Sequence, residues 1–80
     1  MWKEHNNQLQ KTFEFKDFSQ ALSFMTRVAL IAEKMNHHPD WSNKWNIVNI
    51  RLYTHSAGDI VTEKDKKLAE SIDKIHSEFN

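Results

Sequence analysis

Apolar residues recur in this chain with two different periods, and the period changes near the single proline and the single glycine. Alternation with a period of two, typical of a strand with one buried face, precedes Phe18 and returns after Pro39. Steps of three and four residues, typical of an amphipathic helix, run from Phe18 to Met35 and again after Thr62. Pro39 and Gly58 both lie between periodic segments. The chain is therefore expected to combine short strands with two helices.

Two extended regions carry the period-two alternation. Trp2 to Phe15 is predicted to form a hairpin, because Asn6 and Asn7 accept the positive φ values of a tight turn. The residues of this region that share one face are Leu9, Lys11, Phe13 and Phe15. Trp41 to Thr54 is also predicted to be extended, and a break near Asn46 divides it into two strands. The residues of this stretch that face the helices are Val48, Ile50 and Leu52.

The first helix is predicted from Phe18 to Met35. Asp17 or Ser19 is its candidate N-cap, and Asn36 is a candidate C-cap because Asn tolerates the left-handed conformation. The residues that recur at helical spacing are Phe18, Ala21, Leu22, Met25, Val28, Ala29 and Ala32. Three further residues widen the apolar surface beyond one stripe: Phe24, Leu30 and Ile31. A helix with so broad an apolar surface is expected to contact both a sheet and a partner subunit.

The second helix is predicted to begin at Thr62, after a loop from His55 to Val61. Thr62 and Asp65 have the spacing of a capping box, with Asp in place of the usual Glu or Gln. Its buried face is assigned to Leu68, Ala69, Ile72, Ile75 and Phe79. The element order is β-β-α-β-β-α, which predicts an α+β fold: an antiparallel sheet of about four strands with two helices packed on one face.

Length and composition limit the size of the core. The 80 residues are 39% apolar and include no cysteine, so residues 1–80 are expected to form one small domain without disulfides. A chain of this size buries only about 60% of the surface that its unfolded form exposes. Self-association adds buried surface to a small core and is therefore expected.

Charge and hydropathy exclude several classes of partner. Basic and acidic residues each number five up to Asp40 and six after it, so neither half offers a basic surface for direct nucleic-acid binding. No apolar run approaches the ~20 residues of a membrane span, and no polybasic stretch marks a membrane surface. The N-terminal residues lack the apolar segment of a signal peptide, which favours a cytoplasmic location.

Five histidines provide the candidate chemistry. His5 and His76 are interpreted as surface residues, whereas His37 and His38 follow a helix directly and His55 ends an extended run. Imidazole has an ordinary pKa of about 6.5, so these three side chains are candidates for an acid–base site. They can also be three solvated loop residues or zinc ligands. Zinc is the weaker interpretation, because adjacent residues in an extended segment point to opposite sides.

One segment resembles the signature of the pterin-4a-carbinolamine dehydratases. It is Glu33-Lys34-Met35-Asn36-His37-His38-Pro39-Asp40-Trp41. The spaced residues of the family pattern are matched by Glu33, His37, His38, Pro39, Trp45, His55 and Asp65. The resemblance extends from Trp2 to the end of the chain. Because the motif contains three histidines spread over more than thirty positions, it favours the acid–base interpretation over solvated loops.

The resemblance implies dehydration of 4a-hydroxytetrahydrobiopterin, or a related hydroxytetrahydropterin, to quinonoid dihydropterin in tetrahydrobiopterin recycling. The implied catalytic residues are His37, His38 and His55. His37 and His55 flank the reacting C4a–N5 edge as acid and base, in either order, while His38 binds the substrate or assists on one face. The implied reaction uses a small-molecule pterin and requires no metal or other cofactor.

The resemblance also implies a set of substrate-binding residues: Glu33, Pro39, Trp41, Thr54, Ser56 and Asp65. Glu33 and Asp65 are expected to orient imidazoles or bind polar groups of the pterin. Thr54 and Ser56 are expected to form hydrogen bonds with the ring, and Trp41 to wall the pocket. Glu33 is alternatively an exposed residue of the last helical turn, and Asp65 a charge that favours the start of the second helix.

A second class of function is a protein-interaction module without enzymatic activity. Animal relatives also act as dimerisation cofactors for a homeodomain transcription factor, through the helical surface and not the histidine site. Nothing in the sequence identifies such a partner for this chain. An interaction module does not require His37, His38 and His55 to converge on one pocket, so their positions discriminate between the two classes.

Overall fold

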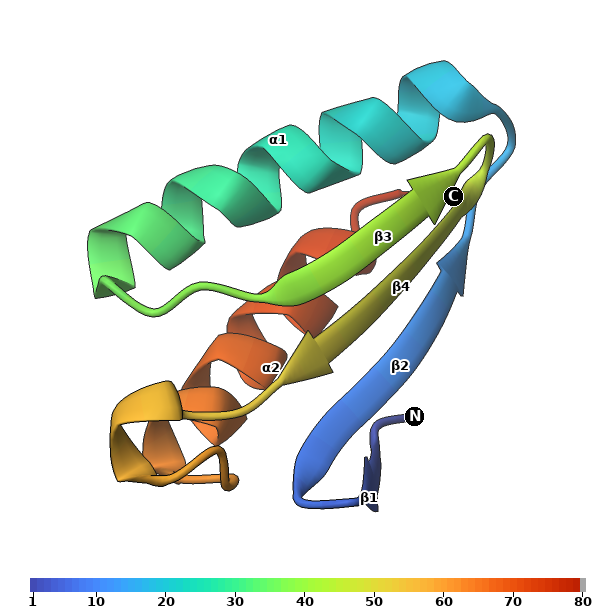
Figure 1. Ribbon diagram of the computed structural model, residues 1–80. Helices are drawn as coiled ribbons and strands as arrows, with labels where there is room; N and C mark the ends of the chain where they lie inside the picture. Colours follow the sequence, from blue (N-terminus) through green and yellow to red (C-terminus); the bar gives the residue numbers. More distant parts are fainter. Residues whose placement is uncertain (80) are drawn as a thin grey trace.

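Four antiparallel strands and two helices make up the computed structural model, which describes residues 1–79 (Figure 1). The elements in chain order are β1 (Lys3–His5), β2 (Gln8–Glu14), α1 (Phe18–Met35), β3 (Asp40–Lys44), β4 (Ile47–Leu52) and α2 (Glu63–His76). A single turn of 3-10 helix, η1 (His55–Ala57), lies between β4 and α2. The strand order across the sheet is β1-β2-β4-β3. The predicted α+β class and the order β-β-α-β-β-α are confirmed.

Both hairpin turns use residues with positive φ. Asn6 and Asn7 have φ values of 53° and 62°, which confirms the predicted first turn. At the second turn the residue with positive φ is Trp45, at 50°, next to the predicted Asn46. The Asn46 side-chain amide donates to the carbonyl of Phe15 over 2.8 Å, and the Phe15 N–H donates to the Asn46 carbonyl over 2.9 Å. The turn between β3 and β4 is therefore tied to the end of β2.

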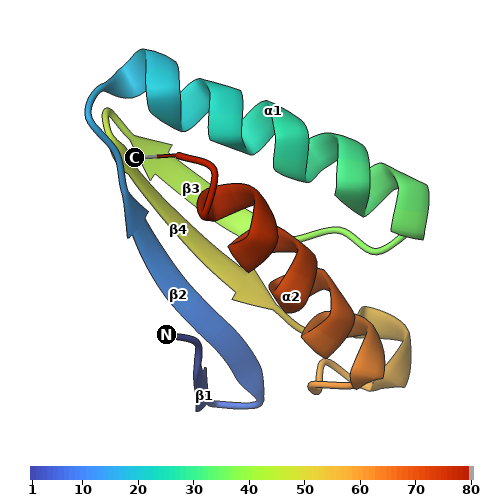
Figure 2. The same ribbon diagram turned by 180° about the vertical axis from the view of Figure 1, so that it is seen from behind.

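The core lies between the sheet and the two helices, which cover the same face (Figures 1 and 2). From β4 it takes Val48, Ile50 and Leu52, as predicted. From α2 it takes Leu68, Ala69, Ile72 and Ile75; Phe79, beyond the helix, is only partly buried against this core. The open face of the sheet carries mainly polar side chains, since alternate strand residues point to opposite faces.

Helix α1 has the predicted bounds and caps. Its N-cap is Asp17, whose carboxylate accepts the N–H of Gln20 over 2.8 Å, and its C-cap is Asn36, with φ at 52°. The buried stripe differs from the prediction and consists of Ala21, Phe24, Val28 and Ala32. Phe18, Leu22 and Ala29 are exposed instead. The helix is turned so that Phe24, its largest buried side chain, packs 5.0 Å from the ring of Phe13 and 4.8 Å from that of Phe15.

The interpretation of His76 as a surface residue is wrong. Its imidazole is half-buried at the end of α2. The centroid of this ring lies 4.9 Å from the ring centroid of Phe13, 5.6 Å from that of Phe15 and 6.0 Å from that of Phe24. Desolvation in this cluster, and to a lesser extent the charge of Lys11, lower the pKa of His76 from its ordinary 6.5. His5, by contrast, is exposed as predicted.

No helix in residues 1–79 is both long enough and apolar enough to cross a bilayer.

Because the pKa of His76 is lower in the folded chain than in the unfolded chain, the unfolded state binds a proton more readily. The stability that neutral His76 provides is present above the ordinary pKa of about 6.5 and is lost as the pH falls below it. We expect His76→Phe, which keeps an aromatic ring in the cluster, to reduce the loss of stability between about pH 7 and pH 5. Urea denaturation at several pH values measures this effect.

The matched control is His5→Gln, which removes an exposed imidazole. Its unfolding free energy should follow that of the wild type across the same pH range. An unchanged pH slope in His76→Phe would contradict this role of His76.

Candidate active site

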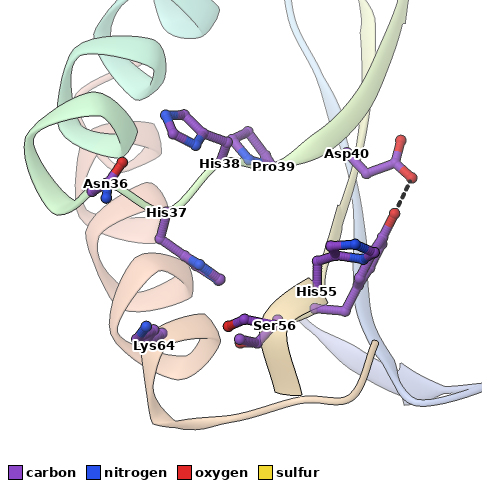
Figure 3. Close-up of a pocket in the computed structure, with 10 residues that line it drawn as sticks. Asn36, His37, His38, Pro39, Asp40, His55, Ser56 and Lys64 are labelled. Atoms are coloured by element: carbon purple, nitrogen blue, oxygen red, sulfur yellow. Dashed lines mark hydrogen bonds between the residues drawn. The ribbon is translucent and has the colours of Figure 1, made fainter. Parts of the chain in front are cut away.

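A pocket of about 520 Å³ lies at the end of the sheet where α1 and β4 finish and α2 begins (Figure 3). Its volume is within the usual range for small-molecule sites. The residues that line it are Asn36, His37, His38, Pro39, Asp40, Tyr53, Thr54, His55, Ser56 and Lys64. The three histidines singled out from the sequence therefore lie around one recess.

Local backbone structure brings the two histidine segments to this end of the sheet. The left-handed Asn36 ends α1, and the N–H of His37 donates to the carbonyl of Ala32 over 3.0 Å. Pro39 then continues the chain in an extended conformation into β3. On the other side, β4 ends at Leu52 and His55 is the first residue of η1. Both segments are loops held by rigid elements, the usual position for functional side chains.

A buried carboxylate holds His37. The His37 Nε2 atom lies 2.5 Å from Oδ1 of Asp65, which is fully buried at the start of α2. The other oxygen, Oδ2, accepts the Thr54 hydroxyl over 2.8 Å and the Thr62 N–H over 2.8 Å. Since the Thr54 proton is donated to Asp65, the Thr62 hydroxyl donates to the Thr54 oxygen, 2.6 Å away. Asp65 thus fixes the orientation of the His37 ring and also forms half of the predicted capping box.

The other two histidines also pair with carboxylates, but on the surface. His38 Nε2 lies 2.9 Å from Oε1 of Glu33, and His55 Nδ1 lies 2.8 Å from Oδ1 of Asp59. Figure 3 shows His37 and His38 leaving the backbone on opposite sides, as expected for neighbours in an extended segment. His37 and His55 lie across the pocket from each other, on the α1 side and the η1 side.

The remaining ring nitrogens of His37 and His55 are the ones free to exchange protons. Among residues 1–79 no side-chain or backbone group forms a hydrogen bond with Nδ1 of His37 or Nε2 of His55. In residues 1–79, every fully buried side-chain nitrogen or oxygen has a hydrogen-bond partner. Because Nδ1 of His37 has none, this atom is not fully buried and reaches solvent. The pocket that His37 lines supplies that solvent.

Other residues of the predicted set have different positions. Pro39, Thr54 and Ser56 line the pocket, whereas Asp65 lies behind His37. Trp41 does not line the pocket; it is half-buried against the hydrophobic core, because its side chain points to the helix-covered face of the sheet. Glu33 is exposed at the end of α1 and reaches the site only through His38.

Sequence reasoning missed an anchored carboxylate on the pocket wall. Asp40 accepts the Arg51 guanidinium at Oδ1 over 3.0 Å and the Tyr53 hydroxyl at Oδ2 over 3.0 Å. The hydrogen bond from Arg51, followed by that from Tyr53, holds the pKa of Asp40 below its usual value, and the bond to Asp40 raises the pKa of Tyr53. The contact depends on the β3–β4 register, which pairs Asp40 with Arg51. Asn36 and Lys64 were also missed as lining residues.

Within residues 1–79, no group of three or more His, Cys, Asp and Glu side chains is arranged to hold a metal ion.

Comparisons with known proteins identify the family of this chain and bear out its fold. The family described as Pterin 4 alpha carbinolamine dehydratase matches residues 1–75, and the chain belongs to this family. A Synechococcus sp. (strain WH7803) protein named "Putative pterin-4-alpha-carbinolamine dehydratase" is 50% identical over 74 residues, which cover 92% of this chain and 78% of the relative. A Prochlorococcus marinus (strain NATL2A) protein of the same name is also 50% identical, over 92% of this chain and 77% of its own length.

Two solved structures have the same fold. A transcriptional coactivator/pterin dehydratase from Brucella melitensis is similar with a TM-score of 0.88 and 43% identity, over 92% of this chain and 80% of that one. A pterin dehydratase-like protein described as a RuBisCO assembly factor in the alpha-carboxysome is similar with a TM-score of 0.78 and 26% identity, over 92% and 87% of the two chains. The suspected family resemblance is therefore confirmed.

We expect Asp65→Ala to lower the free energy of unfolding by about 3 kcal/mol, because several buried hydrogen-bond donors lose their common acceptor. The substitution leaves the Thr54 hydroxyl and the Thr62 N–H without their acceptor. Thr54→Val should cost about 1 kcal/mol, because it removes one hydrogen bond to the same carboxylate. Urea denaturation at pH 7 measures both values.

Asp59→Asn is the control, because Asp59 pairs with its histidine on the surface. It should leave stability nearly unchanged. If Asp65→Ala and Asp59→Asn lowered the free energy of unfolding equally, the buried contacts of Asp65 would not stabilise the fold as proposed.

Proposed function

We propose that this protein catalyses the dehydration of a 4a-hydroxytetrahydropterin to quinonoid dihydropterin. The observation that supports this function best is the arrangement of His37 and His55 across one pocket. Each has one ring nitrogen bound to a carboxylate and the other free. The pocket volume of about 520 Å³ accommodates a bicyclic heterocycle with a short substituent. Membership of the dehydratase family supports the same reaction.

The proposed chemistry needs one proton donor and one proton acceptor. Hydroxide is a poor leaving group, so a protonated imidazole donates a proton to the C4a oxygen as the C4a–O bond breaks. A neutral imidazole accepts the N5 proton, and the N–H electron pair forms the new C4a=N5 double bond. Water leaves, and because H and OH are lost together, the step needs no oxidant or reductant. The two imidazoles end with their protonation states exchanged, and solvent restores them.

His37 and His55 take these two roles in our proposal, in an order that the geometry leaves open. Asp65 orients His37 from behind the pocket. His38, held by Glu33 on the surface, binds the substrate at the pocket edge. Pro39, Thr54 and Ser56 contribute to the substrate-binding wall. Trp41 supports that wall from the core instead of contacting the substrate.

Replacing either His37 or His55 by Gln should lower kcat by roughly 10²–10⁴, the usual contribution of a positioned acid or base. His38→Gln should act mainly on KM, because its ring is held at the edge of the pocket. Stopped-flow absorbance of quinonoid dihydropterin formation from freshly generated 4a-hydroxytetrahydropterin measures these parameters. Subtraction of the uncatalysed dehydration gives the enzymatic rate.

His5→Gln is the control for loss of an imidazole far from the pocket and should retain wild-type activity. Full activity in either His37→Gln or His55→Gln would contradict the assignment of that residue. Absence of any wild-type activity above the uncatalysed rate would contradict the proposed function itself.

A function as an interaction module is the second candidate, and the site does not favour it. The Brucella melitensis structure is described as a transcriptional coactivator/pterin dehydratase, and the carboxysome protein as an assembly factor for RuBisCO. Those descriptions belong to those proteins. A docking protein does not need a pocket bordered by three carboxylate-paired imidazoles, and this chain has one.

We also propose that the protein forms a homodimer or homotetramer in the cytoplasm. The support is apolar surface on α1, where Phe18 is 46%, Leu22 50% and Leu30 68% exposed. Apolar side chains gathered on one helix are typical of an association surface.

Leu30→Lys is expected to weaken self-association, because it places a charge in the proposed apolar contact. Sedimentation velocity of wild type and variant at several concentrations measures the change. Thr12→Lys, on the open face of the sheet, is the control and should retain the wild-type assembly state. A wild type that sediments as a monomer at every concentration would contradict the proposal.

A further inference from the structure

We propose that Asp59 is a positioning residue that holds His55 in the tautomer its role requires. The inference rests on the proposed function, because that function gives His55 a proton to transfer. The direct observation is a hydrogen bond of 2.8 Å between Nδ1 of His55 and Oδ1 of Asp59. Asp59 lies in the loop between η1 and α2 and is not one of the residues of the family motif.

Backbone hydrogen bonds within this loop hold Asp59 close to His55. An isolated bridge pairs Thr54 with Ile60, and the Thr54 N–H donates to the Ile60 carbonyl over 2.8 Å. Inside the bridge, the Gly58 N–H donates to the His55 carbonyl over 3.0 Å, and the Asp59 N–H donates to the Thr54 carbonyl over 3.1 Å. These bonds close the loop at its base. The Asp59 side chain is therefore held close to the imidazole by backbone contacts that do not depend on the side chain.

Asp59 occupies a backbone conformation that favours glycine. Its φ is 60°, directly after Gly58 with φ at 91°. A glycine adopts this left-handed region without a Cβ penalty, whereas most other residues do not. Asp and Asn are the residues that tolerate it best after glycine, because their short polar side chains form local hydrogen bonds. Here that bond goes to His55, so the carboxylate compensates for an unfavourable backbone position.

The contact determines which nitrogen of His55 is available. An ionised carboxylate only accepts hydrogen bonds, so Nδ1 must carry the hydrogen and Nε2 is left to exchange a proton with the substrate. Asp65 acts on the other nitrogen of His37, where Nε2 is held and Nδ1 is free. The two imidazoles thus present different ring nitrogens to the pocket, and each is selected by its own carboxylate.

Asp59→Gly separates this role from a purely structural one. Glycine relieves the backbone conformation, so the melting temperature should stay the same or rise. Loss of the carboxylate should nevertheless lower kcat by about fivefold with little change in KM, since an exposed ion pair biases its partner only modestly. Asp59→Asn retains tolerance of positive φ and an acceptor oxygen, and should lie between the wild type and Asp59→Gly. Glu63→Gln, which removes an exposed carboxylate of α2 outside the pocket, should match the wild type.

The ¹⁵N chemical shifts of the His55 ring test the same inference without turnover. In the wild type at a pH where the imidazole is neutral, the shifts should report Nδ1–H as the dominant tautomer. In Asp59→Gly they should move toward Nε2–H. Unchanged shifts, or unchanged kcat in a folded Asp59→Gly, would overturn the role of Asp59. A wild type with the expected shifts but no dehydratase activity would overturn the proposed function and leave the Asp59 contact established.

Discussion

The buried carboxylate of Asp65 joins three segments of the chain: the end of α1, the end of β4 and the start of α2. One of its oxygens contacts His37 at the end of α1, and the other accepts from Thr54 after β4 and from Thr62 before α2. A carboxyl group with no exposure to solvent is tolerated because its hydrogen bonds come from three separate segments. The same atoms start a helix, join it to the sheet and orient an imidazole. Fold and site are therefore specified together at this point.

A second constraint acts at the opposite end of α2. The imidazole of His76 packs edge to face against three rings: Phe13 in β2, Phe15 just after β2 and Phe24 in α1. The rings of Phe13 and Phe24 also contact each other, tilted by 40°. Aromatic rings of this size set the rotation of α1, because the face with Phe24 must point inward. The exposed positions of Leu22 and Leu30 follow from that rotation. Packing of a few large side chains in this small core thus determines which face of α1 is buried.

Much of the fold could be predicted from the sequence because its local signals agree with one another. The pair Asn6-Asn7, the caps Asp17 and Asn36, and the alternation through Val48 and Leu52 all specify structure within a few residues. The rotation of α1 was misjudged because two apolar stripes are present and only tertiary packing chooses between them. His76 was misjudged because its neighbours Phe13 and Phe24 are distant in sequence.

The candidate site was likewise predicted only where local sequence signals specify it, and not where it depends on tertiary contacts. The spaced histidine motif indicated His37, His38 and His55, which do line one pocket. The Asp40–Arg51 contact depends on strand register, and the His55–Asp59 contact depends on a left-handed backbone conformation at a residue other than glycine. Neither is visible in a periodic pattern. Trp41 was expected in the wall because aromatic residues suit a flat ligand, but alternation along β3 turns it to the core.

The groove between α1 and α2 is bordered by Leu30, Ile31 and Ile75, and it shares no residue with the histidine pocket. A partner that contacts only this groove would therefore touch none of the residues that line the histidine pocket. Selection on one surface can proceed without compromise on the other. Residues of the groove can therefore be substituted without altering any residue of the pocket wall.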